Sequence, residues 1–202
     1  MIRSAALAFI VAAVILPAHA QGVSTDASLA PAGTYAADTA HTRISWQLSH
    51  FGTSTYTGWF KSFEISLTFD PNAPEKSKLT ASVDPTSVST LDPKFDEEIA
   101  SAKFLDAAKF PAVTFTAATI TKTGETTGTM TGDLTFHGVT KPVTFNVTFH
   151  GGTQSAMKNA YVLGFGATAT IKRSEFGVIE YIDFGLGDDV TIGIEGEFIH
   201  QE

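Results

Sequence analysis

The sequence predicts an all-β protein: a closed antiparallel barrel of about eight strands, with one short helix inserted around residues 93–108. Three observations lead to this prediction. Apolar and small polar residues alternate over several long segments, as on strands with one buried face. Thr is frequent in these segments, and a good helical pattern occurs once. Closure would remove the unpaired edges of such a sheet, although the pattern alone does not separate a barrel from a sandwich.

The first 20 residues have the pattern of a secretory signal peptide. Arg3 precedes an apolar run of about a dozen residues, and an Ala-x-Ala site ends at Ala20. The run is shorter than the ~20 residues that a membrane-spanning helix needs. We therefore expect cleavage after Ala20 rather than a retained anchor. Residues 21–33 are small and polar, which predicts a flexible lead before one domain over residues 34–202.

Composition narrows the class of partner and the compartment. Cleavage removes Arg3 and leaves 12 basic against 21 acidic residues, a net charge of −9. Such a surface repels phosphate backbones, so nucleic acid is not an expected partner. The chain has no Cys, which excludes disulfides and thiolate metal sites. An exported domain of this size without disulfides fits the bacterial periplasm.

The alternating segments are spread over the whole domain and mark its strands. Gly58 interrupts the second of them, which suggests a bulge or bend. The last three carry long apolar faces rich in Phe, Ile and Ala. Strands are expected at residues 42–49, 56–70, 79–83, 113–120, 128–137, 142–150, 161–171 and 190–200.

One segment has helix signals instead. Asp92 is a suitable N-cap, and Pro93 suits the first helical position. Phe95 and Ile99 fall on one face of the turns that follow. The acidic run at residues 96–98 favours the positive end of the helix dipole and needs no catalytic explanation.

The two strands at residues 132–150 carry an unusual number of Phe side chains on one face. Phe136, Phe145 and Phe149 lie on that apolar face, and the other face is small and polar. If the apolar face points inward, Thr144, Asn146 and Thr148 should face solvent.

Motifs for catalysis and metal binding are missing. There is no Cys nucleophile and no G-x-S-x-G elbow. The histidines of the expected mature chain lie near strand ends, without the spacing of a metal site. Residues 164–169 match G-x-G-x-x-A but lie within a strand pattern, so they do not indicate a dinucleotide site. We expect no catalytic residue, no metal and no required cofactor.

Arg173 allows two interpretations. It follows a long apolar strand and precedes a Phe-Gly turn, so it could meet a polar or anionic head group at a barrel mouth. It could equally be a solvated cation, or form an ion pair with Glu175 or Asp183.

Several ordered motifs resemble the YceI-like family. They are His50-Phe51-Gly52, Gly58-Trp59-Phe60, Phe69-Asp70-Pro71, the segment FLDAAKFP at residues 104–111, GDLTFHGVTKPV at residues 132–143, IKRSEFG at residues 171–177 and GDDV at residues 187–190. Together they span most of the chain after the lead, and several motifs in order are more specific than any one of them.

The resemblance implies a lipocalin-like barrel that binds a long isoprenoid, either a polyprenyl chain or an isoprenoid quinone, in an apolar tunnel. It also implies a periplasmic protein, a possible homodimer and possible transient contact with a membrane or with membrane redox proteins. No catalytic residues come with it. The small residues Gly164, Gly166, Ala167 and Ala169 are expected to leave room for a tail. The expected ligand-binding residues are Trp46, Leu48, His50, Phe115, Phe136, Phe145, Phe149, Phe165, Arg173 and Phe176.

The main hypothesis is thus a non-enzymatic carrier of an isoprenoid lipid. Two alternatives stay open at this point. One is an accessory redox factor that acts on a bound quinone, with His50 or Arg173 at the head group. The other is a stress-protective or interaction protein whose barrel is packed solid.

Overall fold

The computed structural model describes residues 22–201. The predicted signal peptide at residues 1–20 lies outside the described residues. Between residues 22 and 201, no helix combines the length and the hydropathy needed to cross a bilayer.

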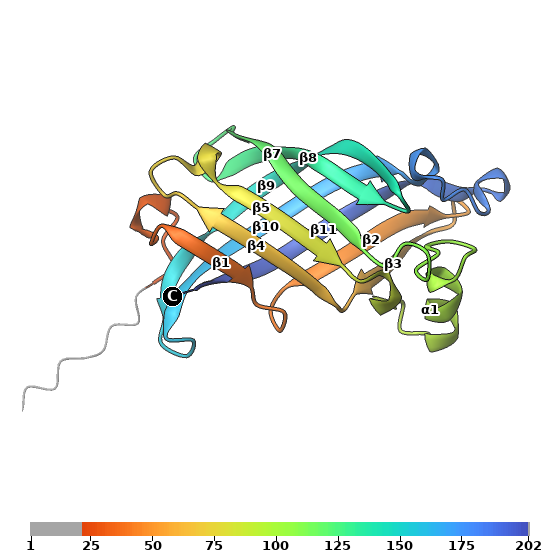
Figure 1. Ribbon diagram of the computed structural model, residues 1–202, viewed down its shortest axis with the longest axis horizontal. Coiled ribbons are helices and arrows are strands. Elements are labelled where there is room, and N and C mark those ends of the chain that lie inside the picture. The colour runs from red at the N-terminus through yellow and green to blue at the C-terminus, as the bar shows by residue number, and fades with distance from the viewer. Residues whose placement is uncertain (1–21, 202) are drawn as a thin grey trace, which may run out of the picture.

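Eight antiparallel strands close into a barrel, which confirms the predicted fold class (Figure 1). Each strand is hydrogen-bonded to the next, and the last pairs with the first. An interior of this size can be filled by side chains or can hold one small ligand. In order around the barrel, the strands are β1 (Gly33–Ala37), β4 (Phe63–Phe69), β5 (Lys78–Val83), β7 (Val113–Lys122), β8 (Thr127–Phe136), β9 (Val139–Ser155), β10 (Ala160–Lys172) and β11 (Leu186–His200).

Three further strands branch from the long strand β11. They are β2 (Arg43–His50), β3 (Ser54–Phe60) and the two-residue β6 (Val88–Ser89). β2 occupies the edge of β11 between Leu186 and Glu195, and β1 takes over that edge from Phe198 to His200. The barrel is therefore closed by β1 at one end, while β2 and β3 continue the sheet at the other.

The single strand predicted at residues 56–70 is two strands, β3 and β4, separated by Lys61 and Ser62. The backbone amide of Lys61 donates to the carbonyl of Ser87 at 3.1 Å. That of Ser62 donates to the Ser87 hydroxyl at 3.0 Å. These bonds come from a distant loop and take the place of ladder bonds, so β3 pairs with β6 and β4 pairs with β5. The short strand β1 was not predicted, because Gly33–Ala37 lacks clear alternation.

Helix α1 (Pro93–Ala100) lies at the end of the barrel opposite the C-terminus (Figure 1). Asp92 caps it as expected, and its carboxylate accepts from the amides of Lys94 and Phe95. The helix is shorter than the predicted range of 93–108. After Ala100 the chain folds back in turns, because the amide of Leu105 donates to the Ile99 carbonyl and that of Ala107 to the Ala100 carbonyl. Leu105 and Ala107 are buried in these turns.

The described part of the expected flexible lead packs against the barrel, which differs from the prediction. Ser24 forms a bridge with Gly152 of β9, and a short 3-10 helix covers Ala27–Leu29. Ala30 is 5% exposed in a core cluster. Ala30 is buried at the barrel end although its segment has no alternating pattern. The composition of the segment therefore gave no sign that it packs against the barrel.

The walls have an apolar inner face and a hydroxyl-rich outer face. On β4 buried and exposed residues alternate along the whole strand. On the outer face, the side chains of Thr131 and Thr144 are hydrogen-bonded at 2.7 Å across β8 and β9. The prediction for β9 is confirmed: Thr144, Asn146 and Thr148 are exposed.

Candidate functional site

The barrel interior contains an apolar cavity of about 270 Å³ beside α1, which we call the helix-end cavity. Strands β2, β3, β10 and β11 supply part of its wall. Strands β7 and β8 contribute Val113, Leu134 and Phe136. Helix α1 and the turns after it add Phe95, Ile99, Phe104 and Leu105. The β2–β3 turn and the loop at residues 173–185, which we call the mouth loop, line one end of the cavity. Phe51 is 44% exposed at that end, so we take the region of Phe51, Tyr181 and Leu186 as the mouth.

A second apolar cavity, of about 200 Å³, occupies the other half of the barrel, and we call it the far-end cavity. Its wall includes Leu67 of β4 and the T-shaped pair Phe115 and Phe145, whose ring centroids are 5.2 Å apart. Exposed charged side chains also line it: Glu75, Lys122 at the end of β7, and Glu125 in the β7–β8 turn. Charged side chains therefore border the far-end cavity, whereas aromatic side chains such as Phe51 and Tyr181 border the mouth of the helix-end cavity.

The two cavities lie end to end along the barrel. On β11, Ile192 lines the helix-end cavity and Ile194 lines the far-end cavity. On β10, Ala169 lies between Ile171 of the first and Ala167 of the second, and it is 6% exposed. A small residue therefore stands between the two cavities.

Placed end to end, the two cavities extend along most of the barrel. Leu186 and Phe198 line opposite ends of the combined space and are 12 residues apart on β11. At ~3.3 Å per residue this is roughly 40 Å along the strand. With the usual strand tilt of 35–45°, the span is roughly 30 Å along the barrel axis. Such a shape suits a chain-like apolar molecule better than a compact one.

The structure brings nine of the ten predicted ligand-binding residues to these two cavities. The exception, Phe176, lines neither cavity. It is 1% exposed and packs behind Phe136, with ring centroids 5.5 Å apart. The helix-end cavity is lined by Trp46, Leu48, His50, Phe136 and Arg173, and the far-end cavity by Phe115, Phe145, Phe149 and Phe165.

Arg173 is neither solvated nor ion-paired with Glu175 or Asp183. It is 3% exposed, and its guanidinium donates to the carbonyls of Gly187, Val178 and Leu186 at 2.8, 3.0 and 3.3 Å. Burial lowers the pKa of Arg173, and nearby Asp188 and Glu180 act in the opposite direction. Its three bonds fix the loop that forms the mouth of the helix-end cavity.

The expectation that Gly164 and Gly166 leave room for a tail is wrong, because both face outward. A Cβ at Gly166 would lie 2.8 Å from Oε1 of Glu195 and 3.0 Å from Nε2 of His150, two exposed side chains on the outer wall. Only Ala167 and Ala169 of the expected set face inward. Period-2 alternation already requires this, since residues 164 and 166 share a face opposite to 167 and 169.

Sequence reasoning missed the contribution of α1 and its neighbours to the cavity wall. Phe95 and Ile99 line the helix-end cavity, as do Tyr56 of β3 and Tyr181 of the mouth loop. The helical spacing of Phe95 and Ile99 was a usable signal, because an apolar helix face must be buried against something. No comparable sequence pattern indicates that Tyr181 lines the cavity.

Trp46 has an unusual polar atom. Within residues 22–201 its indole Nε1 is buried and has no hydrogen-bond partner. The ring packs directly over Gly58, where a Cβ would lie 2.3 Å from Cζ2 of the indole. Gly58 is thus the position that lets the indole lie flat on β3 and form part of the helix-end cavity.

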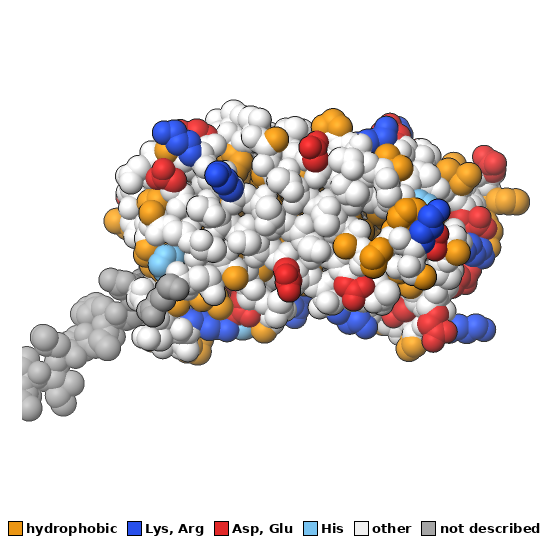
Figure 2. All heavy atoms as spheres, viewed as in Figure 1, with side chains coloured by type: hydrophobic (Ala, Val, Ile, Leu, Met, Phe, Trp, Pro, Cys, Tyr) orange, Lys and Arg blue, Asp and Glu red, His pale blue; other side chains and the backbone are white. Residues whose placement is uncertain are grey.

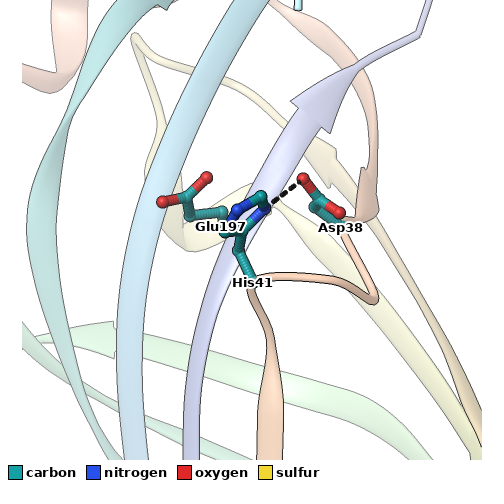
Figure 3. A group of neighbouring side chains, drawn as sticks. All are labelled: Asp38, His41 and Glu197. Atoms are coloured by element: carbon teal, nitrogen blue, oxygen red, sulfur yellow. Dashed lines mark hydrogen bonds and ion pairs between the residues drawn. The ribbon is translucent and has the colours of Figure 1, made fainter.

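A separate group of ligating side chains lies near the junction of β1, β2 and β11. Figure 3 shows His41 between Asp38 and Glu197, and their ligating atoms lie within 4.8 Å of one another. The Asp38 carboxylate already binds the Lys158 ammonium at 2.6 Å and the His41 ring at 2.8 Å. The bonds from Lys158, then from His41, lower the pKa of Asp38 to about 2. Asp38, His41 and Lys158 thus form an ion-pair network that ties the β1–β2 connection to the β9–β10 turn. The Lys158 ammonium supplies the positive charge that a metal ion would otherwise bring to Asp38.

Comparisons with known proteins agree on one family. A model of the YceI-like domain matches residues 35–198. A UPF0312 protein of Pseudomonas putida strain GB-1 is 40% identical over 156 residues, covering 77% of this chain and 81% of that protein.

Solved structures share the fold. The crystal structure of Burkholderia cenocepacia BcnA superimposes with a TM-score of 0.71 at 26% identity, over 80% of this chain and 98% of that one. A polyisoprenoid binding domain from Saccharophagus degradans, implicated in plant cell wall breakdown, gives a TM-score of 0.59 at 14% identity. It covers 85% of this chain and 100% of that domain, and at this identity the likeness concerns the fold alone.

Proposed function

The chain belongs to the YceI-like family, and from that premise we propose that it binds and carries a long-chain isoprenoid lipid without catalysing a reaction. The observation that carries the proposal is the pair of apolar cavities arranged end to end inside the barrel. The name of the Saccharophagus degradans domain, which has the same fold, points to the same class of ligand.

The physical reason lies in the balance of apolar and polar groups along the cavities. Burial of apolar surface contributes about 25 cal/mol per Å², so a long hydrocarbon tail gains affinity along its whole length. Pockets for small polar substrates instead carry several convergent polar groups. Aromatic and aliphatic side chains such as Phe136, Phe145 and Ile192 dominate these walls.

We further propose that the head group lies in or near the mouth of the helix-end cavity. Three residues that line that cavity carry polar atoms: Trp46, whose buried N–H has no partner within residues 22–201, His50, and Tyr181, whose hydroxyl accepts from Lys103. An oxygen-bearing head group would supply the acceptor that the Trp46 N–H lacks.

We propose that this activity is periplasmic, because residues 1–20 have the sequence pattern of a secretory signal peptide. There, a soluble carrier lets an isoprenoid cross water between membranes, since the barrel wall presents Thr hydroxyls such as Thr131 and Thr144 outward and encloses the tail. The acidic composition keeps the carrier away from other polyanions.

The test is to purify the protein from its native envelope, extract it with organic solvent and identify the lipids by mass spectrometry. We expect an isoprenoid in near-stoichiometric amount, displaced by added polyprenol but not by a short-chain alcohol. Repeated extraction without an isoprenoid, together with no binding of added polyprenol to the lipid-free protein, would refute the proposal.

A further inference from the structure

Three exposed apolar side chains stand around the mouth of the helix-end cavity. Phe51 is 44% exposed in the turn between β2 and β3. Ile179 and Phe184 are 65% and 77% exposed in the loop between β10 and β11. In Figure 2 the middle of the visible wall is mostly white, and apolar side chains gather toward the ends. We call Phe51, Ile179 and Phe184 the mouth patch.

The mouth patch is continuous with the cavity. Phe51 lines the helix-end cavity itself. Val178, the neighbour of Ile179, lines it too, and so does Tyr181, whose ring centroid is 6.1 Å from that of Phe184. An apolar chain leaving the cavity would therefore meet apolar side chains before it met water.

The backbone that carries the patch is held in an unfavourable conformation. Phe51 has a φ of 52° and is followed by Gly52 with a φ of 72°. Hairpin turns with two successive positive φ values normally use Asn-Gly or Asp-Gly, and a bulky side chain is rare there. Tyr181 in the second loop also has a positive φ, of 60°. The strained backbone and the exposed apolar side chains both lower the stability of the folded protein. Their presence at this end therefore points to a role in binding rather than in folding.

The charge around the mouth patch and its exposed apolar area indicate which kind of partner it binds. Glu180 and Asp183 lie within the mouth loop. The Lys103 ammonium donates to the Tyr181 hydroxyl and is also held by Glu98 at 2.6 Å, and the Lys172 ammonium is paired with Asp189 at 2.8 Å. Such a surface does not attract an anionic membrane or partner. The three exposed side chains offer on the order of 350 Å² of apolar area, taking about 200 Å² for a fully exposed large side chain. A stable dimer uses about 800 Å² per partner.

We propose that the mouth patch inserts into the surface of a zwitterionic phospholipid bilayer, where an isoprenoid passes directly between the membrane and the helix-end cavity. The inference rests on the proposed function for its cargo. Small apolar tips on two separate loops suit the shallow interfacial region of a bilayer, where apolar side chains gain burial without requiring a complementary shape.

The test is flotation of the lipid-free protein with phosphatidylcholine vesicles. Phe51→Asn restores the residue that the turn prefers, so we expect an unchanged or higher Tm together with about a tenfold weaker partition into vesicles. The double variant I179S/F184S should lose more. Met157→Asn is the matched control, because Met157 is 95% exposed in the β9–β10 turn, away from the mouth. It should float like the wild type, and wild-type binding should persist at high salt.

The inference would be overturned by no flotation of the wild type, by equal losses for Phe51→Asn and Met157→Asn, or by flotation only with anionic vesicles. Self-association through the patch, seen as a mass change that Phe51→Asn abolishes, would also overturn it. Polyprenol binding in detergent is measured on the same preparation. If polyprenol binds but the protein does not float, the docking inference fails and the proposed function stands. If the protein floats but binds no polyprenol, the proposed function fails.

Discussion

Filling the far-end cavity should separate long from short ligands. Ala167 is 9% exposed, faces inward from β10 and lines that cavity. Its neighbours across the sheet, Val147 and Ile194, line it as well. A benzene ring is accommodated by a cavity of roughly 150 Å³, and this one holds about 200 Å³. The ring introduced by Ala167→Phe would therefore fit within it and leave little room for a ligand tail.

The expected loss of affinity follows from the tail that no longer fits. The far-end cavity is about 200 Å³ of a combined 470 Å³, the sum of about 200 and 270 Å³, or roughly two fifths of the space. Each buried methylene contributes about 0.8 kcal/mol. Excluding four of them costs about 3 kcal/mol, which is more than 100-fold in Kd. A short isoprenol that fits within the helix-end cavity alone should bind unchanged.

The assay is a titration followed by tryptophan fluorescence. Trp46 lines the helix-end cavity and so reports both ligands, and the other tryptophan, Trp59, lines neither cavity. The matched control is Thr168→Phe, which adds a ring at the next residue on the exposed outer face of β10. Because the void is larger than the ring, the Tm of Ala167→Phe should stay within about 3 °C of the wild type. A folded Ala167→Phe protein that binds a long polyprenol with wild-type Kd would refute the two-cavity reasoning.

Three further predictions concern single residues. Leu91→Gly should raise the free energy of unfolding by up to about 1 kcal/mol in chemical denaturation, because Leu91 is 83% exposed and has a φ of 69°. Gly58→Ala should shift the tryptophan emission maximum and weaken ligand quenching, since the new Cβ displaces the Trp46 ring; unchanged emission would contradict the packing. The pKa of Asp38 is lowered from 3.8 to about 2, first by the bond from Lys158, so its stabilisation is present above about pH 4 and is lost as the pH falls toward 2. Asp38→Asn should therefore have a lower Tm at neutral pH but a shallower fall in Tm over that acid range, and an equally steep fall would count against the ion pair.

The sequence was sufficient for the architecture because alternation is a strong local signal. Strands β7 to β11 carry long faces that are apolar on one side and polar on the other, and each was predicted with its type correct. β1 could not be predicted, since five residues of Gly, Thr, Tyr and Ala carry little pattern. The break between β3 and β4 depends on bonds from Ser87, 25 residues away from Ser62, which no local pattern contains.

The candidate site was predictable to the level of a strand face and no further. Once the apolar faces of β7, β9 and β10 are assigned inward, residues such as Phe115, Phe145 and Phe165 must line the interior. Which residue touches void and which touches another side chain depends on packing around the whole barrel. Phe136 lines a cavity, while Phe176 fills space behind it. Arg173 illustrates the limit for polar groups, because its three acceptors are backbone carbonyls at positions 178, 186 and 187, and carbonyls have no signature in a sequence.

The split between β3 and β4 explains why the two cavities differ. At the far end, β1 pairs with both β4 and β11, so the wall there is continuous hydrogen-bonded sheet. At the helix end, the outer edge of β3 pairs only with the two-residue strand β6, because β5 pairs with β4. Side chains of α1 cover that part of the interior. A wall made of side chains from a short helix can yield with fewer broken hydrogen bonds than a wall of paired strands. Loading and release of a lipid should therefore occur at the helix end, beside the mouth patch, with the far-end cavity receiving the tip of the tail.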